Sequence, residues 1–112
     1  MQSRVWLAQR LSAMVLAVAV TVHLGGMILA VQGGLTAAEI IQRVGGNGVA
    51  ASFYGIFVLA AAVHAPIGLR TVLLEMTALN PRVADGVAGV FAVAVLVLGL
   101  RAVLGFYQLG AV

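Results

Sequence analysis

The sequence predicts an all-α integral membrane protein with three transmembrane helices in a multi-chain bundle. Of its 112 residues, 63% are hydrophobic and 8% are charged, whereas a soluble domain carries roughly a quarter charged residues. Three long apolar stretches, separated by polar or glycine-rich turns, have the length of the roughly 20 apolar residues that a spanning helix needs. These stretches do not alternate polar and apolar residues, as the strands of a membrane barrel do.

The composition also excludes several classes of protein. Six Arg and three acidic residues cannot cover a water-facing surface, which excludes a soluble enzyme and a disordered tail. The absence of Cys excludes a disulfide scaffold and iron–sulfur ligation by this chain. The net charge of +3 comes from scattered Arg that form no patch, so we expect membrane lipid and no nucleic acid as a partner. We expect one membrane-anchor domain over residues 1–112.

The first helix is expected at about residues 5–31. It is too long for the hydrophobic region of a signal peptide, and it ends before the turn-forming Gln32-Gly33-Gly34. The following segment, Leu35–Val44, is mildly amphipathic, so both a short interfacial helix and a plain loop remain open.

The second and third helices are expected at about residues 50–77 and 83–109. The second follows the turn composition Gly45-Gly46-Asn47-Gly48, and Pro66 inside it removes one backbone hydrogen bond, which predicts a kink. Asn80-Pro81 breaks the chain before the third helix.

The arginines predict the orientation. Two lie near the N-terminus and two near the turn between the second and third helices, whereas the first loop carries only Arg43. We expect a multi-pass protein of a bacterial-type inner membrane. Because cytoplasmic loops carry the excess of Arg and Lys, its N-terminus should face the cytoplasm and its C-terminus the outside.

Polar residues inside the helices are the functional candidates, because a charge at the bilayer centre costs at least ~2.5 kcal/mol. His23 and His64 lie on different helices, and neutral imidazole is a common axial ligand of haem iron. The alternative is that each His bonds a neighbouring helix. Small residues flank both His at helical spacing and either admit a macrocycle or let helices pack closely: Ala19, Gly26, Ala60, Ala61 and Gly68.

Depth favours separate sites for the two His. Counted from the outer helix ends, His23 and His64 differ in depth by roughly 9 Å at ~1.5 Å per residue. Two axial nitrogens on one iron lie only about 4 Å apart, taking a bond near ~2 Å. The sequence therefore favours two haems, each completed by a His of another chain. Arg101 either pairs with a propionate or snorkels outward, and we favour snorkelling.

Two segments carry a family resemblance. Gln9-Arg10-Leu11-Ser12-Ala13 opens the first helix, and Val63-His64-Ala65-Pro66-Ile67-Gly68-Leu69-Arg70, followed by Leu74-Glu75, lies in the second. Together with the three spans, they resemble the cytochrome b membrane-anchor subunit of succinate dehydrogenases and fumarate reductases. That family has a His-Arg-x-Ser/Thr-Gly motif in the first helix and a His-x-x-x-Gly-Ile-Arg-His…Asp motif in the second.

The resemblance implies roles for individual residues. His64 matches the family's haem axial ligand, and His23 resembles the first-helix His of the two-haem subgroup. The expected quinone or propionate contacts are Arg10, Ser12, Trp6 and Arg70. The chain departs from the family pattern with Gln9 for His, Ala13 for Gly, Thr71 for His and Trp6 for a quinone-contacting Ser. Glu75 stands where the family usually has Asp.

The resemblance also implies a function. A cytoplasmic flavoprotein subunit and an iron–sulfur subunit would dock on this chain and exchange electrons with ubiquinone or menaquinone through haem b, one or two per complex. A second three-helix anchor, or a second copy of this chain, would supply the missing ligands. No flavin chemistry and no catalytic residue is expected in this chain. Two alternatives stay open: a non-redox packing or assembly subunit, and a cytochrome b anchor of a different flavin dehydrogenase.

Overall fold

A computed structural model describes residues 2–110 of the chain, which form four α-helices and no strand. They are α1 (Gln2–Gly33), α2 (Ala37–Val44), α3 (Gly48–Met76) and α4 (Pro81–Leu109). α1, α3 and α4 are long and apolar enough to cross a membrane, with mean hydropathies of 2.3, 1.8 and 2.5. The predicted three-span helical architecture is confirmed. The predicted domain over residues 1–112 also includes residues 1, 111 and 112, which lie outside the described residues.

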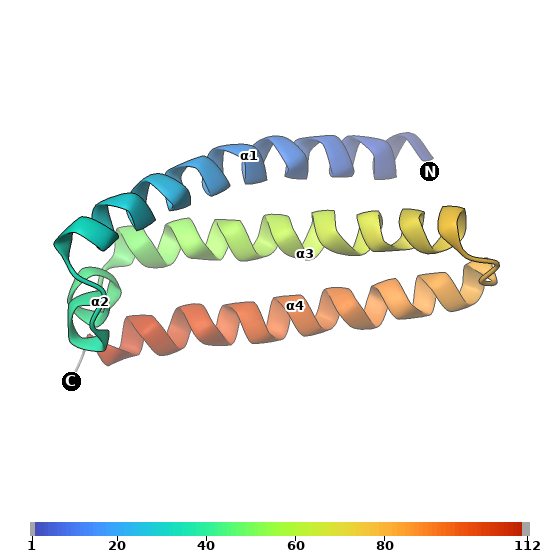
Figure 1. Ribbon diagram of the computed structural model, residues 1–112. Coiled ribbons are helices and arrows are strands. Elements are labelled where there is room, and N and C mark those ends of the chain that lie inside the picture. Colours follow the sequence, from blue (N-terminus) through green and yellow to red (C-terminus); the bar gives the residue numbers. More distant parts are fainter. Residues whose placement is uncertain (1, 111–112) are drawn as a thin grey trace.

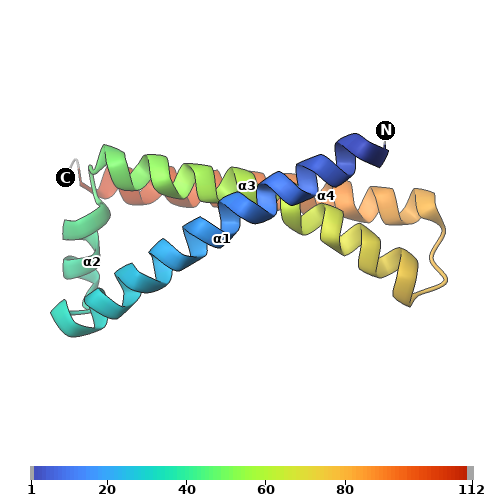
Figure 2. The same cartoon turned by 90° about the horizontal axis from the view of Figure 1, so that it is seen from above.

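α3 is the central helix of the bundle. In Figure 1 it runs between α1 and α4, and Figure 2 shows α1 crossing it obliquely. The N-terminus and the α3–α4 turn lie at one end, and α2 and the end of α4 lie at the other (Figure 1). The two Arg-bearing segments that the orientation prediction assigns to the cytoplasm therefore lie at the same end of the bundle.

Side-chain caps set where α3 and α4 begin. Asn47 Oδ1 accepts hydrogen bonds from Val49 N at 3.0 Å and Ala50 N at 3.2 Å, and Asn80 Oδ1 accepts one from Arg82 N at 2.9 Å. Each cap satisfies backbone N–H groups that have no partner within the helix. Both helices therefore begin two residues before the expected positions 50 and 83. α1 likewise extends beyond the expected range of 5–31 at both ends.

The amphipathic segment after α1 is a helix rather than a plain loop. Thr36 caps α2, accepting from Glu39 N at 3.2 Å and donating to Glu39 Oε1 at 2.6 Å. Gly34 and Gly46 turn the chain on either side of α2 with φ of 127° and 65°, a backbone region in which only glycine is unstrained. Of the two structures that the sequence left open, the short helix is the one observed.

The turn between α2 and α3 is fastened to the end of α4. Gly46 N donates a hydrogen bond of 2.9 Å to the carbonyl of Tyr107. A Cβ at Gly110 would overlap the backbone of Gly45 and Gly46, so the two segments touch through their main chains. The turn between α2 and α3 and the last turn of α4 therefore form one joined unit.

Small residues make the helix contacts. Ser12, Ala19, Ala60, Ala84 and Ala88 are buried, each with an exposed fraction of 9% or less. Small side chains let helix backbones approach closely, as is usual in membranes. Large apolar side chains instead face outward along all three long helices, so lipid or other chains must cover them. The bend expected from Pro66 is visible in Figure 2, where the yellow end of α3 diverges from α4.

Candidate functional site

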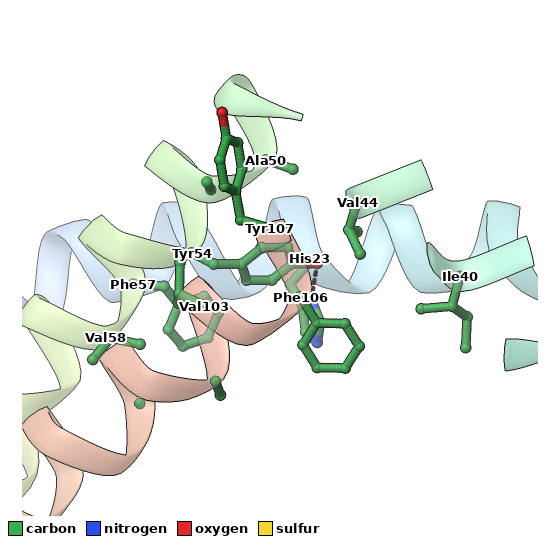
Figure 3. Close-up of a pocket in the computed structure, with 13 residues that line it drawn as sticks. His23, Ile40, Val44, Ala50, Tyr54, Phe57, Val58, Val103, Phe106 and Tyr107 are labelled. Carbon is green, nitrogen blue, oxygen red and sulfur yellow. Dashed lines mark hydrogen bonds between the residues drawn. The ribbon is translucent and has the colours of Figure 1, made fainter. Parts of the chain in front are cut away.

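His23 of α1 is held among aromatic rings of α3. Its ring centroid lies 5.8 Å from the rings of both Tyr54 and Phe57, at interplanar angles of 85° and 88°. Tyr54 Oη lies 3.4 Å from His23 Nδ1 (Figure 3). Edge-to-face contacts of this kind stabilise ring pairs by about 0.5–1.5 kcal/mol beyond burial alone. The half-buried imidazole is therefore oriented by two rings and one hydroxyl.

The same imidazole faces a pocket of about 430 Å³ near the α2 end of the bundle. All four helices contribute to its walls, including Ile40 and Val44 of α2 and Phe106 of α4 (Figure 3). Aliphatic and aromatic side chains dominate the lining, and His23 is its one ionisable nitrogen group. A mostly apolar cavity with few polar groups is the usual form of a cofactor or small-molecule site.

His64 of α3 has a different environment. It is half-buried, and its Nδ1 is enclosed without a hydrogen-bond partner. Gln9 Oε1 of α1 is enclosed in the same way, while Gln9 Nε2 lies 3.6 Å from the position of a Cβ on Gly68, one turn after His64. Leaving a buried polar group unpaired costs about 1–3 kcal/mol. His64 Nδ1 and Gln9 Oε1 are therefore two costly polar atoms that the described residues leave without a hydrogen bond.

The two His do not meet. His23 lies at the level of Tyr54 and Phe57, which precede His64 by ten and seven residues on α3. At ~1.5 Å per residue, this places the imidazoles roughly 10–15 Å apart along the bundle. One iron cannot take both, in agreement with the separation expected from the sequence.

The expected quinone and propionate residues gather toward the opposite end of the bundle. Arg10 and Trp6 form a cation–π contact, with the guanidinium carbon 5.3 Å from the ring centroid. Ser12 is buried and donates to the carbonyl of Gln9 at 3.0 Å. Arg70 forms an ion pair with Asp85 of α4. The Gln9–Gly68 contact places these parts of α1 and α3 beside each other.

Sequence reasoning missed two of these contacts. Neither Tyr54 nor Asp85 was singled out, because their partners lie 31 and 15 positions away in the chain and become neighbours only through helix packing. Asp85 could have been noticed because it is an acidic residue near the start of a membrane span, where a charged side chain needs a partner. Arg101 is exposed on α4 and does not line the His23 pocket, so pairing with a group in that pocket has no support.

The small residues flanking the His differ in what they contact. Ala19 and Ala60 are buried and Gly68 faces Gln9, so they serve helix packing, whereas Gly26 faces open space. No group of three or more metal-binding side chains occurs within residues 2–110. A haem with two axial nitrogens needs no such group. The chain thus offers two separate imidazoles, each able to supply one ligand of a haem.

Three apolar spans, two separated intramembrane imidazoles and polar residues at one end define a multi-pass helical membrane subunit. The family model of the succinate dehydrogenase/fumarate reductase transmembrane subunit matches residues 1–103, and the chain belongs to this family. It is therefore a membrane-anchor subunit that associates with the soluble subunits of such a complex. A search of curated proteins and a search of solved structures gave no match.

Proposed function

We propose that this chain is a haem b-binding anchor of a succinate:quinone oxidoreductase in a bacterial-type inner membrane, with its N-terminus in the cytoplasm. It docks an iron–sulfur subunit and a flavoprotein subunit on that side and passes electrons to or from ubiquinone or menaquinone. The observation that carries the proposal is the pair of intramembrane imidazoles, held at two depths in a chain of this family.

His64 and His23 are the proposed axial ligands, one for each of two haems. The half-buried position of His64 within a membrane-spanning helix and the pocket in front of His23 support this assignment. When bound, haem b supplies one-electron transfer. The protein's part is to hold an imidazole nitrogen toward the iron and, around His23, to exclude water with apolar walls.

The polar residues at the N-terminal end of α1 are the proposed quinone or propionate contacts. Arg10 is exposed and offers charge-assisted hydrogen bonds to an anionic oxygen. Trp6 stacks beside it. Ser12 lies two residues further along α1, and Arg70 lies on α3 two residues after Gly68, which faces Gln9. At this depth a quinone headgroup would lie close to the docked iron–sulfur subunit.

A second membrane chain completes the sites. Each proposed iron has only one ligand from this chain, and the long helices expose large apolar side chains such as Leu29, Val90 and Leu98. A second three-helix anchor, or a second copy of this chain, would supply both the missing imidazoles and a cover for these surfaces.

The test is the ratio of haem b to covalently bound flavin in the purified complex, read from a reduced-minus-oxidised spectrum. We expect two haems per flavin, and one haem in each of the variants His64→Ala and His23→Ala. A ratio unchanged by His64→Ala contradicts the ligand assignment. A wild-type ratio of one returns His23 to a structural role.

The alternative function is a non-redox packing subunit. The contact between His23 Nδ1 and Tyr54 favours it, because it satisfies one nitrogen of His23 within the chain. This alternative predicts a complex without haem, so the same spectrum distinguishes the two functions.

A further inference from the structure

We infer that Tyr54 is a positioning residue for His23: its hydroxyl holds Nδ1 and leaves Nε2 as the nitrogen that binds a cofactor. This inference rests on the proposed function of His23 as an axial ligand. It assigns to a residue of α3 the task of orienting a ligand that belongs to α1.

The geometry points to an orienting role. Tyr54 Oη approaches Nδ1 rather than Nε2, at 3.4 Å, and the edge-to-face contacts with Tyr54 and Phe57 hold the ring plane nearly perpendicular to both of their rings. The three side chains also line one pocket (Figure 3). Two further edge-to-face contacts connect Phe53 to Tyr54 and to Phe57, at 5.1 and 6.2 Å. The orienting rings are therefore themselves supported along α3.

The chemistry of imidazole sets the direction of the hydrogen bond. A neutral His carries one proton, and the nitrogen that binds iron must be the one without it. When Nε2 is the ligand, Nδ1–H donates a hydrogen bond to Tyr54 Oη, because a phenol oxygen can act as an acceptor. Partners of this kind fix the tautomer of a ligating His and raise its basicity.

The magnitude follows from the distance. Loss of such an outer partner typically lowers affinity for the metal 10–100-fold. The 3.4 Å separation exceeds the ordinary hydrogen-bond range, and phenol is a weaker acceptor than a carboxylate. We therefore expect Tyr54→Phe to weaken retention of the haem that His23 would bind, here called the outer haem, by about 10-fold, the lower end of that range. The haem that His64 would bind is called the inner haem.

The test compares Tyr54→Phe with Tyr107→Phe in the purified whole complex. The chain has two Tyr, and both line this pocket, but the Tyr107 hydroxyl points away from His23 in Figure 3. Tyr107→Phe thus removes the same group from the same pocket without touching the imidazole. The readouts are haem retention, the low-spin haem signals in electron paramagnetic resonance, and the midpoint potential of each haem. The signal lost in His23→Ala identifies the outer haem.

We expect Tyr54→Phe to shift the outer signal and raise the outer midpoint potential, because a less basic imidazole stabilises ferric iron less well. The inner haem and the Tyr107→Phe complex should match the wild type. Two haems with unchanged signals in Tyr54→Phe would overturn the role of Tyr54 and leave His23 a ligand. Fewer than two haems in the wild type, or equal shifts in both Tyr variants, would also overturn it. Fewer than two haems in the wild type would trace the failure to the proposed function itself, whereas the other two outcomes would concern only the role of Tyr54.

Discussion

Gly99→Ala should destabilise the bundle by driving α4 away from α3. An ideal Cβ on Gly99 lies 2.5 Å from Val58 Cγ1 and 2.9 Å from Val58 Cγ2, whereas ordinary contacts begin at 3.4 Å. Val is stiff at χ1 in a helix, so it cannot turn both methyls away. The two helices must therefore separate locally by roughly 0.9 Å, the difference between 3.4 and 2.5 Å.

Two opposing effects set the magnitude. Overpacking of this kind costs about 1–3 kcal/mol, while replacing an interior helical Gly by Ala gains about 0.5–1 kcal/mol. The central values leave a net loss of about 1 kcal/mol, which corresponds to a fall in melting temperature of about 4 °C at about 4 °C per kcal/mol. The melting temperature can be followed by size-exclusion chromatography of the heated, detergent-solubilised complex.

The matched control is Gly105→Ala on the same helix, where no atom lies within 4 Å of the added Cβ. It should keep or raise the melting temperature. The double variant Gly99→Ala/Val58→Ala should recover part of the loss, with a coupling of about 0.5–3 kcal/mol. If Gly99→Ala melts no earlier than Gly105→Ala, the close approach at Val58 does not limit the packing of α3 on α4.

Contacts and composition give three further predictions. Asp85→Asn removes the ion pair with Arg70. Because the side chains of Asp85 and Arg70 are partly exposed, at 59% and 43%, the loss of stability measured by melting should stay below about 1 kcal/mol. The exchanged pair Arg70→Asp/Asp85→Arg should recover this loss. Asn80→Ala removes the cap of α4 and should cost about 1 kcal/mol in the same melting assay, against no loss for the exposed Ala78→Ser. Because the chain has no Cys, an impermeant maleimide should label Gln42→Cys only from outside and Ala78→Cys only from the cytoplasm; the reverse pattern would invert the proposed orientation.

The spans were predictable because each is governed by a local property. A run of apolar residues needs no partner to be recognised, so all three long helices were found from the sequence. Their first residues were less predictable, since Asn47 and Asn80 act through single side-chain hydrogen bonds that hydropathy does not register. The segment before Asn47 stayed open because eight residues are too few to form a stable helix alone, and the observed helix has both the Thr36 cap and contacts with α4.

The site was predictable in its residues but not in its contacts. His23 and His64 stand out because ionisable groups are rare in a span, and counting residues was enough to separate their depths. The contact of Tyr54 with His23 depends on the rotation and register of α1 against α3, and many registers satisfy the same apolar pattern. The pairing of Arg70 with Asp85 depends in the same way on how α4 packs on α3.

The hydrogen bond from Gly46 to the carbonyl of Tyr107 has a consequence for biosynthesis. The ribosome releases the turn at Gly46 long before Tyr107, and chains begin to fold as they emerge. The donor on the turn must therefore stay solvated until α4 is inserted. A nascent chain arrested before Tyr107 should expose the turn to proteolysis, and a chain that extends past Tyr107 should protect it, so protection of this turn would report that α4 is inserted.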